Sequence, residues 1–200
     1  MHHEFNALLM IICLPFLVIL LVSGWMVSYV ESAESDTKLT EPMVVDDVDL
    51  NRYMGRWYEI ALIPVWFQKN CAGGTTAEYT LLENGKVGVV NRCCTKDGKV
   101  KEAKGSAWVV DEKTPAKLKV SFFSLFGFWL FAGHYWIVDL DSDYRYAVIG
   151  HPSRDLGWIL SRTPELSEEV LKSISLKLEA NGYDFSRFKM TNQRDFSCLP

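Results

Sequence analysis

The stretch Asn51-Arg52-Tyr53-Met54-Gly55-Arg56-Trp57-Tyr58-Glu59-Ile60 decides how the rest of the chain is interpreted. Gly55 stands before an aromatic run, and glycine tolerates backbone angles at a tight strand entry that a Cβ forbids. The apolar segment that begins at Trp57 is rich in strand-forming residues and ends at Pro64. A tryptophan of this kind can simply fill a core, so its meaning depends on a partner elsewhere in the chain.

A second stretch, Gly157-Trp158-Ile159-Leu160-Ser161-Arg162-Thr163-Pro164, has the pattern of a strand that ends in an arginine. A guanidinium stacked on an indole face is among the better cation–π pairs. We therefore expect Arg162 to stack on Trp57, which would bring the first and the last strand of the domain together.

Short alternating segments separated by turn signals lie between these two stretches, and this pattern is typical of an antiparallel meander. Eight antiparallel strands in sequence close into an up-and-down barrel, with room inside for one small ligand. The predicted fold is therefore all-β, with one helix, Glu165–Ala180, packed on the outside and a possible short extra strand within Phe185–Met190. The eight expected strands are Arg56–Ile63, Thr75–Leu82, Lys86–Cys93, Val100–Val110, Ala116–Phe123, His134–Leu140, Tyr144–Ile149 and Gly157–Ser161.

The ends of the chain differ from this domain. Residues 1–33 contain a long aliphatic run, which indicates a secretory signal peptide or a membrane anchor. Residues 34–48 are polar and acidic and are expected to form a linker, so the barrel domain is placed at 49–200. The protein is therefore expected to be exported: to a bacterial periplasm or outer membrane, as a membrane-anchored envelope protein, or as a secreted protein in a eukaryote.

The formal net charge of the chain is −4, with charges of both signs scattered along it. This gives no electrostatic reason to expect a nucleic-acid partner. No histidine or second cysteine pair has metal-ligand spacing, so neither a metal nor a cofactor is expected.

These motifs together resemble the lipocalin family, in its bacterial outer-membrane and apolipoprotein D-like branch. The motif residues are Gly55 and Trp57 in the first motif, Asp143 and Tyr144 in the second and Arg162 in the third. The second motif departs mildly from the family pattern, because Ser142 stands where a threonine is usual. The resemblance implies a disulfide between Cys71 and Cys198, and Cys93 and Cys94 are then expected to be free thiols.

Strand parity predicts which side chains line the inside of the barrel, because alternate residues point to opposite faces. If Arg162 points inward, Leu160 and Trp158 do so too, and small residues on the fourth strand leave volume inside. The resemblance to the family favours Tyr135 inward. The expected ligand-binding residues are Ala77, Tyr79, Ala103, Ala107, Leu118, Val120, Phe122, Tyr135, Ile137, Trp158 and Leu160.

The segment Ser124–Phe131 is apolar where a polar loop between strands is expected. Exposed apolar patches usually mark an interaction surface, and tryptophan is favoured at a bilayer interface. We expect Phe126, Phe128, Trp129 and Phe131 to contact a membrane. The alternatives are a long buried hairpin and self-association, in which case the protein is a homodimer.

The leading functional hypothesis is non-enzymatic binding, transport or storage of a small lipid, such as a fatty acid or a lysophospholipid. An enzyme that modifies lipids is a rival, in which Cys93 or Cys94 supplies a pocket thiol. A structural module at the membrane surface is a second rival. The resemblance favours the carrier.

Overall fold

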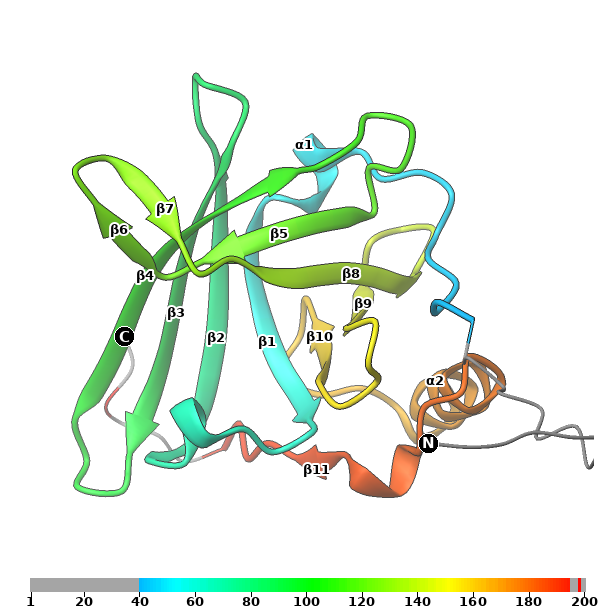
Figure 1. Ribbon diagram of the computed structural model, residues 1–200. Helices are drawn as coiled ribbons and strands as arrows, with labels where there is room; N and C mark the ends of the chain where they lie inside the picture. The colour runs from blue at the N-terminus through cyan, green and yellow to red at the C-terminus, as the bar shows by residue number, and fades with distance from the viewer. Residues whose placement is uncertain (1–39, 195–197, 199–200) are drawn as a thin grey trace, which may run out of the picture. The chain divides into compact units, whose positions relative to one another are not determined.

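The computed structural model describes residues 40–194 and Cys198 (Figure 1). The expected signal peptide or anchor at 1–33 lies outside the described residues. Among the helices in the described part of the chain, none is long and apolar enough to span a membrane.

Strands dominate the described chain, as the alternating pattern predicts. Two short 3₁₀ helices, η1 and η2, and a one-turn helix, α1, accompany them. In chain order the elements are α1 Leu50–Tyr53, β1 Gly55–Leu62, η1 Trp66–Gln68, β2 Cys71–Leu81, β3 Val87–Thr95, β4 Val100–Val109, β5 Lys117–Ser121, β6 Phe123–Leu125, β7 Phe128–Leu130, β8 Gly133–Leu140, β9 Tyr146–Gly150, β10 Gly157–Ser161, α2 Glu168–Ala180, η2 Phe185–Arg187 and β11 Lys189–Met190.

The main sheet has the order β10-β9-β8-β5-β4-β3-β2-β1-β11, and β10 also pairs with β1. This last pairing closes eight strands into an antiparallel barrel, so the predicted fold class is confirmed (Figure 1). Closure removes the exposed strand edges that an open sheet would leave. The extra strand expected near the C-terminus is β11, which pairs with β1 at Ala61 and Leu62.

The barrel has two ends that differ in their connections. The turns β2–β3, β4–β5 and β8–β9 lie at one end, which we call the closed end. The connections β1–β2, β3–β4, β5–β8 and β9–β10 lie at the other, which we call the open end. This assignment follows from strand order alone, because consecutive strands alternate in direction.

Helix α2 covers one side of the barrel (Figure 1). Its Ile174 and Leu178 are buried in a second apolar core with Ile60, Val148 and Ile159, outside the barrel wall. The helix begins at Glu168 and not at the predicted Glu165, because the side chain of Ser167 caps it by accepting a hydrogen bond from the amide of Val170.

Residues 40–48, expected to be part of a linker, lie against the barrel and the end of α2. The side-chain oxygen of Asn181 accepts a hydrogen bond from the backbone N–H of Met43, and its Nδ2 donates one to the carbonyl of Met43, at 2.8 Å each. The backbone N–H of Val45 donates to the carbonyl of Ile137, and Val48 is buried. The segment is held because its valines pack on the barrel core.

Candidate ligand cavity

The closed end is sealed by Trp57 and Arg162. Cζ of Arg162 lies 3.8 Å from the centroid of the Trp57 ring, and Trp57 has no exposed surface. The two NH groups of Arg162 donate to the carbonyls of Arg56 and Arg52 at 2.9 and 2.8 Å. Gly55 sits beside this pair at φ +92°, where a Cβ would lie 3.4 Å from the guanidinium. The two motifs far apart in the sequence therefore meet as the sequence predicts.

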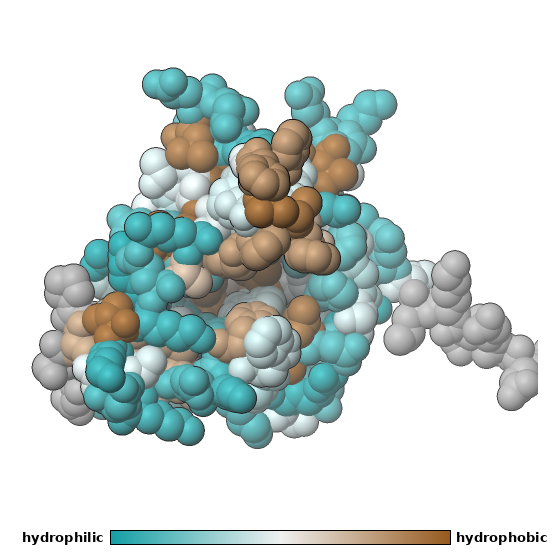
Figure 2. Space-filling view, turned by 60° about the vertical axis from the view of Figure 1, so that its left-hand side comes forward, coloured by the Kyte–Doolittle hydropathy of each residue, from teal (hydrophilic) through white to brown (hydrophobic). Residues whose placement is uncertain are grey.

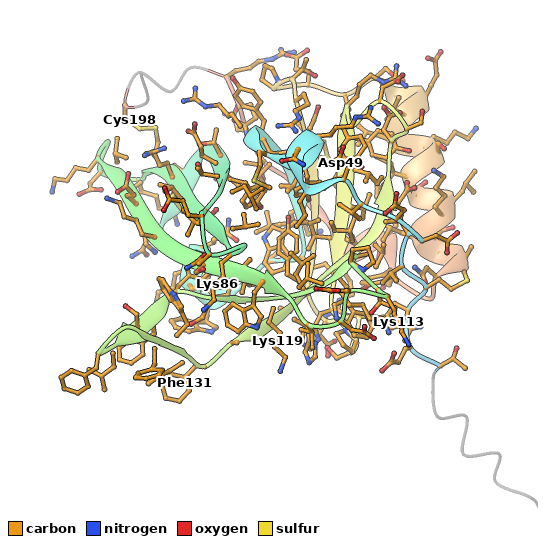
Figure 3. All side chains as sticks on the ribbon, turned by 90° about the horizontal axis from the view of Figure 1, so that it is seen from above. Asp49, Lys86, Lys113, Lys119, Phe131 and Cys198 are labelled. Carbon is orange, nitrogen blue, oxygen red and sulfur yellow. A yellow bond between two sulfur atoms is a disulfide. The ribbon has the colours of Figure 1, made fainter. Side chains whose placement is uncertain are left out.

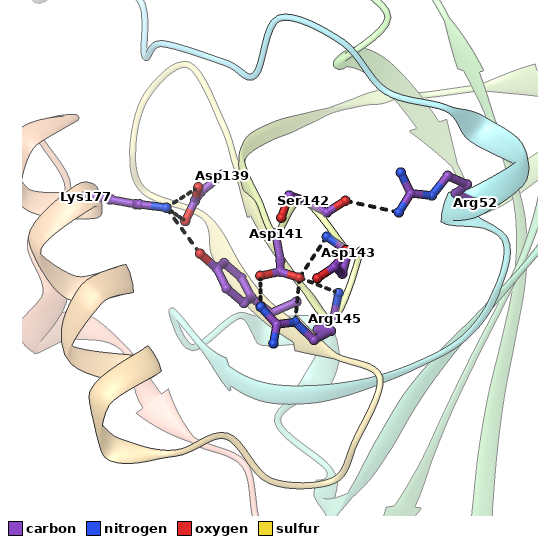
Figure 4. A network of polar contacts seen from close by, with 8 residues as sticks. Arg52, Asp139, Asp141, Ser142, Asp143, Arg145 and Lys177 are labelled. Atoms are coloured by element: carbon purple, nitrogen blue, oxygen red, sulfur yellow. Dashed lines mark hydrogen bonds and ion pairs between the residues drawn. The ribbon is translucent and has the colours of Figure 1, made fainter.

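The second motif shapes the turn between β8 and β9 at this same end (Figure 4). The carboxylate of Asp141 accepts hydrogen bonds from the amides of Asp143 and Arg145 and from the Arg145 side chain. These donors, with the Arg145 guanidinium foremost, lower the pKa of Asp141 to about 2. The Arg52 side chain donates to the carbonyl of Ser142 and lies 4.2 Å from the Tyr144 ring centroid.

A cavity of about 680 Å³ occupies the barrel interior above this seal. Its wall is predominantly apolar and comes from every strand of the barrel. All of the expected ligand-binding residues lie around it, and their contact with a ligand stays a prediction. They are Ala77, Tyr79, Ala103, Ala107, Leu118, Val120, Phe122, Tyr135, Ile137, Trp158 and Leu160.

The small residues of β4 do not all add open volume to the cavity. Ala103 and Ala107 line the cavity, as expected. Gly105 instead makes room for Phe122, because a Cβ there would lie 2.7 Å from the Phe122 ring and 2.6 Å from the carbonyl of Ser121. The Phe122 ring therefore occupies the space that a side chain at position 105 would take.

Three tyrosines form a polar cluster at the deep end of the cavity. The hydroxyl of Tyr135 lies 2.8 Å from that of Tyr53 and 3.0 Å from that of Tyr79. Burial raises the pKa of Tyr79 to about 12 and raises the pKa values of Tyr53 and Tyr135 well above their usual range. All three therefore keep their protons at neutral pH. Two hydrogen bonds use two of the three O–H protons, so one proton remains to be donated to another acceptor.

A buried carboxyl group also lines the cavity, and sequence reasoning missed it. Glu59 is only 4% exposed, and its oxygens accept hydrogen bonds from Gln68 Nε2 and Thr191 Oγ1, both at 2.7 Å. Burial raises the pKa of Glu59, while the hydrogen bonds from Thr191 and Gln68 oppose the rise. Gln68 also accepts a hydrogen bond from the Trp158 indole at 3.1 Å. The one sign of it in the sequence is that Glu59 stands two residues after Trp57 on the same strand, so both side chains point to the inside of the barrel.

The segment Ser124–Phe131 is neither a loop nor a continuation of β5 and β8. Strands β6 and β7 form a separate two-stranded hairpin, with Phe126 and Gly127 at positive φ in its turn. The hydroxyl of Ser121 anchors its base by hydrogen bonds to the carbonyls of Phe123 and Leu130. The hairpin projects from the barrel on the side away from α2, with Phe131 at its base (Figure 3).

The hairpin side chains are exposed, so the alternative of a buried hairpin is wrong. Phe126, Phe128 and Phe131 are 91%, 72% and 88% exposed, and Trp129 is half-buried. Two aromatic residues of the β1–β2 connection, which sequence reasoning missed, are also exposed at this end of the barrel. In Figure 2 hydrophobic residues gather around a hollow in this face. We call the exposed aromatic residues here the aromatic rim: Trp66, Phe67, Phe123, Phe126, Phe128 and Phe131.

The disulfide prediction is wrong. Cys71 is bonded to Cys93 and Cys94 to Cys198, with Cα–Cα distances of 5.7 and 5.9 Å. Adjacent residues of a strand point to opposite faces, so Cys93 faces the cavity beside Cys71 while Cys94 faces outward, where it bonds Cys198. The expected free thiols are therefore bonded, and neither can serve as a nucleophile in this state.

The described residues contain no group of three or more His, Cys, Asp or Glu side chains that could hold a metal ion. His134 lies at the cavity mouth, where its ring is 5.3 Å from that of His151. Both histidines stand at strand ends, and His134 is exposed.

Comparisons with known proteins agree with this geometry. A family model described as a lipocalin-like domain matches residues 48–193. Temperature-induced lipocalin-1 of Arabidopsis thaliana is 41% identical over 162 residues, which cover 80% of this chain and 87% of that protein. Outer membrane lipoprotein Blc of Escherichia coli (strain K12) is 38% identical, with 75% and 82% covered. Apolipoprotein D of Mus musculus is 35% identical, with 78% and 82% covered.

A solved structure supports the fold at lower identity. Insecticyanin from the tobacco hornworm Manduca sexta matches with a TM-score of 0.62 and 22% identity, covering 79% of this chain and 86% of that one. The family match spans the barrel and its motifs, and the relatives include both the bacterial and the apolipoprotein D type. The chain therefore belongs to the lipocalin family, whose members bind small hydrophobic ligands.

Proposed function

We propose that this protein binds and carries a small lipid, such as a fatty acid or a lysophospholipid, in the barrel cavity and catalyses no reaction. The observation that carries the proposal is the cavity of about 680 Å³ with its predominantly apolar wall. Cavities of roughly 300–1,000 Å³ with a few placed polar groups are typical of small-molecule sites. Burying an acyl chain there contributes about 0.8 kcal/mol for each methylene.

The tyrosine cluster supports an orientation for this ligand. Tyr53, Tyr79 and Tyr135 hold one unused O–H donor at the deep end, which suits a carboxylate or phosphate oxygen. The mouth is lined by Phe122, Phe123 and Phe131, which suit the tail. The ligand therefore enters with its polar group first.

A matched pair of variants on β4 tests the carrier function. Ala103 faces the cavity, whereas the adjacent Lys104 has a side chain 73% exposed on the outer face. Ala103→Trp should take up part of the cavity and weaken the binding of a fluorescent fatty acid, and Lys104→Trp should leave this binding unchanged. If both variants bind like the wild type, the ligand does not lie in the cavity and the proposal fails.

The thiol enzyme is not favoured by the structure, because Cys93 and Cys94 are both in disulfides. Alkylation of the native protein should therefore leave lipid binding and any lipid-modifying activity unchanged. The names of the relatives, an outer membrane lipoprotein and an apolipoprotein, support an exported protein. We infer that it acts at a cell envelope or outside the cell.

We also propose that the aromatic rim contacts a membrane surface. Exposing this much aromatic area to water is unfavourable unless something covers it, and aromatic rings are favoured at the bilayer interface. Phe126 adds support, because a bulky residue at φ 49° is uncommon in a turn that Gly or Asn would suit better. The rim surrounds the cavity mouth, so a docked protein would present its entrance to the lipid.

Flotation with phosphatidylcholine liposomes tests this contact. Phe126→Ser with Phe128→Ser should reduce the bound fraction, because both side chains are exposed hairpin residues. The control is Val110→Ser with Leu176→Ser, which removes exposed apolar side chains from the closed end and from α2. If both pairs of substitutions reduce the liposome-bound fraction equally, the proposal is overturned. If only the hairpin variant converts a dimer to a monomer, the aromatic rim is a surface for self-association.

A further inference from the structure

We propose that Asn91 selects lipids that carry a hydroxyl group within their apolar part. This inference rests on the proposed lipid-binding function and names the class of ligand that the cavity prefers. Asn91 lines the cavity on the inward face of β3, between Val89 and Cys93. It was not among the residues expected from the sequence.

The side chain of Asn91 has a buried and unpaired polar atom. Its Oδ1 is buried, and no donor from the described residues lies within hydrogen-bond distance of it. Buried polar atoms in proteins are nearly always paired, because an unpaired one costs about 1–3 kcal/mol. Ser106 Oγ is also buried and unpaired, but Ser106 does not line the cavity. Asn91 is therefore the one of the two whose side chain lines the cavity, and a turn of its amide group brings Oδ1 toward a ligand there.

The residues directly opposite Asn91 on the neighbouring strands are small. Ala77 on β2 and Ala103 on β4 stand directly opposite it on either side, and both line the cavity. Directly opposite side chains on a sheet are the closest neighbours across the strands. Since both are alanines, neither of the directly opposite side chains is large enough to fill the cavity in front of Asn91.

The position of Asn91 is separate from the tyrosine cluster. Val89, two residues earlier on β3, pairs with Tyr79. Two residues along a strand span about 7 Å, so Asn91 lies roughly that far from the level of Tyr79 toward the open end. A lipid whose head group reaches the tyrosines would therefore meet the Asn91 amide along its chain or ring system.

A hydroxyl group is the simple lipid substituent that fits this amide in either orientation. Oδ1 needs a donor and Nδ2 needs an acceptor, and turning the amide by 180° exchanges the positions of these two atoms. A hydroxyl group offers both, whereas a ketone only accepts and a methylene does neither. Hydroxy fatty acids and lipids with a hydroxylated ring carry such a group within their apolar part.

The test compares 7-hydroxystearic acid with stearic acid, each displacing a fluorescent fatty acid from the purified full-length protein. The hydroxyl of the first acid lies roughly 7 Å along the chain from its carboxylate, which matches the separation of Asn91 from the level of Tyr79. The wild type should bind the hydroxylated acid roughly 5- to 10-fold more tightly, because a buried hydrogen-bonding site discriminates against an analogue that leaves it unpaired. Asn91→Leu should lose this preference and bind stearic acid at least as tightly as the wild type. Thr75→Val, which removes a hydroxyl elsewhere in the cavity wall, should keep the preference.

Each outcome decides a different statement. Equal binding of both acids by the wild type, or a preference that survives in Asn91→Leu, overturns the inference while the carrier function stands. Binding of neither acid, nor of a lysophospholipid in the same assay, overturns the carrier function itself. If Leu at this position prevents folding, Asn91→Ala removes the amide without adding bulk and gives the same test.

Discussion

The two ends of the barrel are built from different interactions. The closed end is held by non-covalent contacts. Arg162 stacks on Trp57 and donates to two backbone carbonyls, and Arg145 pairs with Asp141 in the β8–β9 turn. The open end carries the aromatic rim, and its strands β2 and β3 are tied by the Cys71–Cys93 disulfide. The difference shows that each end is stabilised in its own way: packing and hydrogen bonds hold the closed end, and a disulfide holds the open end, which also exposes the surface that a ligand or membrane can use.

The largest effect is expected from the disulfides near the open end. Cys94–Cys198 closes a loop with a sequence separation of 104 and Cys71–Cys93 one of 22. On the chain-entropy model, removing the first costs about 4–5 kcal/mol and removing the second about 3 kcal/mol. Urea unfolding of Cys94→Ala/Cys198→Ala and of Cys71→Ala/Cys93→Ala measures both losses.

Peptide mapping of the non-reduced protein supplies the control for this comparison. It should recover a bridge from Cys94 to Cys198 and another from Cys71 to Cys93. A peptide that joins Cys71 to Cys198 would show that the pairing implied by the family resemblance is the native one. The loop lengths would then differ, and the predicted order of the two losses in unfolding free energy would no longer hold.

Two tryptophans, one at each end of the barrel, differ in burial and therefore in their expected contribution to stability. Trp57 is fully buried at the closed end, and Trp66 is 81% exposed at the open end. Trp57→Ala should lower the free energy of unfolding by about 3–5 kcal/mol, because it leaves a large cavity under Arg162. Trp66→Ala should change it by less than about 0.5 kcal/mol. Thermal melts of both variants decide this, and equal losses would mean that Trp66 is covered in the folded protein.

The closed end could be predicted from the sequence, because a few residues with strict geometric roles create it. Gly55 has a positive φ, and Trp57 and Arg162 form a stacked pair, so these residue types in this order indicated one pairing. The cavity lining followed from strand parity for the same reason, since the period of two is fixed by the backbone.

The open end could be predicted only in part. The apolar segment at 124–131 was visible, but its folding as a separate hairpin depends on Ser121, whose hydroxyl binds two carbonyls of the hairpin. The pairing of Cys71 depended on which of four cysteines folding brings near it, and spacing does not fix that. Glu59 and Asn91 were missed because a single polar residue in a strand gives no periodic signal.

Asp141 at the closed end should give an acid-dependent effect. Its pKa of about 2 lies below the usual value for an aspartate of about 3.9, so the folded state favours the carboxylate. This stabilisation is present above pH 4 or so and is lost as the pH falls through 2. Asp141→Asn should cost about 1–2 kcal/mol at pH 7, because charged hydrogen bonds to the turn are lost. Unfolding at pH 7 and pH 2 should show the difference from the wild type shrinking in acid.

Glu59, on the side of the cavity that leads to the open end, should show the opposite pH dependence and the smallest effect. Burial raises its pKa, so the folded state favours the protonated form. The stabilisation is therefore fully present below the pKa of the unfolded state, about 4.3, and is lost as the pH rises through the higher folded value. Glu59→Gln keeps an acceptor for Gln68 and can donate to Thr191, but it never ionises. Melting temperatures measured from pH 4 to pH 8 should rise for Glu59→Gln relative to the wild type as the pH increases. A difference that is constant with pH would mean that the Glu59 carboxyl titrates as it does in the unfolded chain, and the contrast in sign between the two ends would fail.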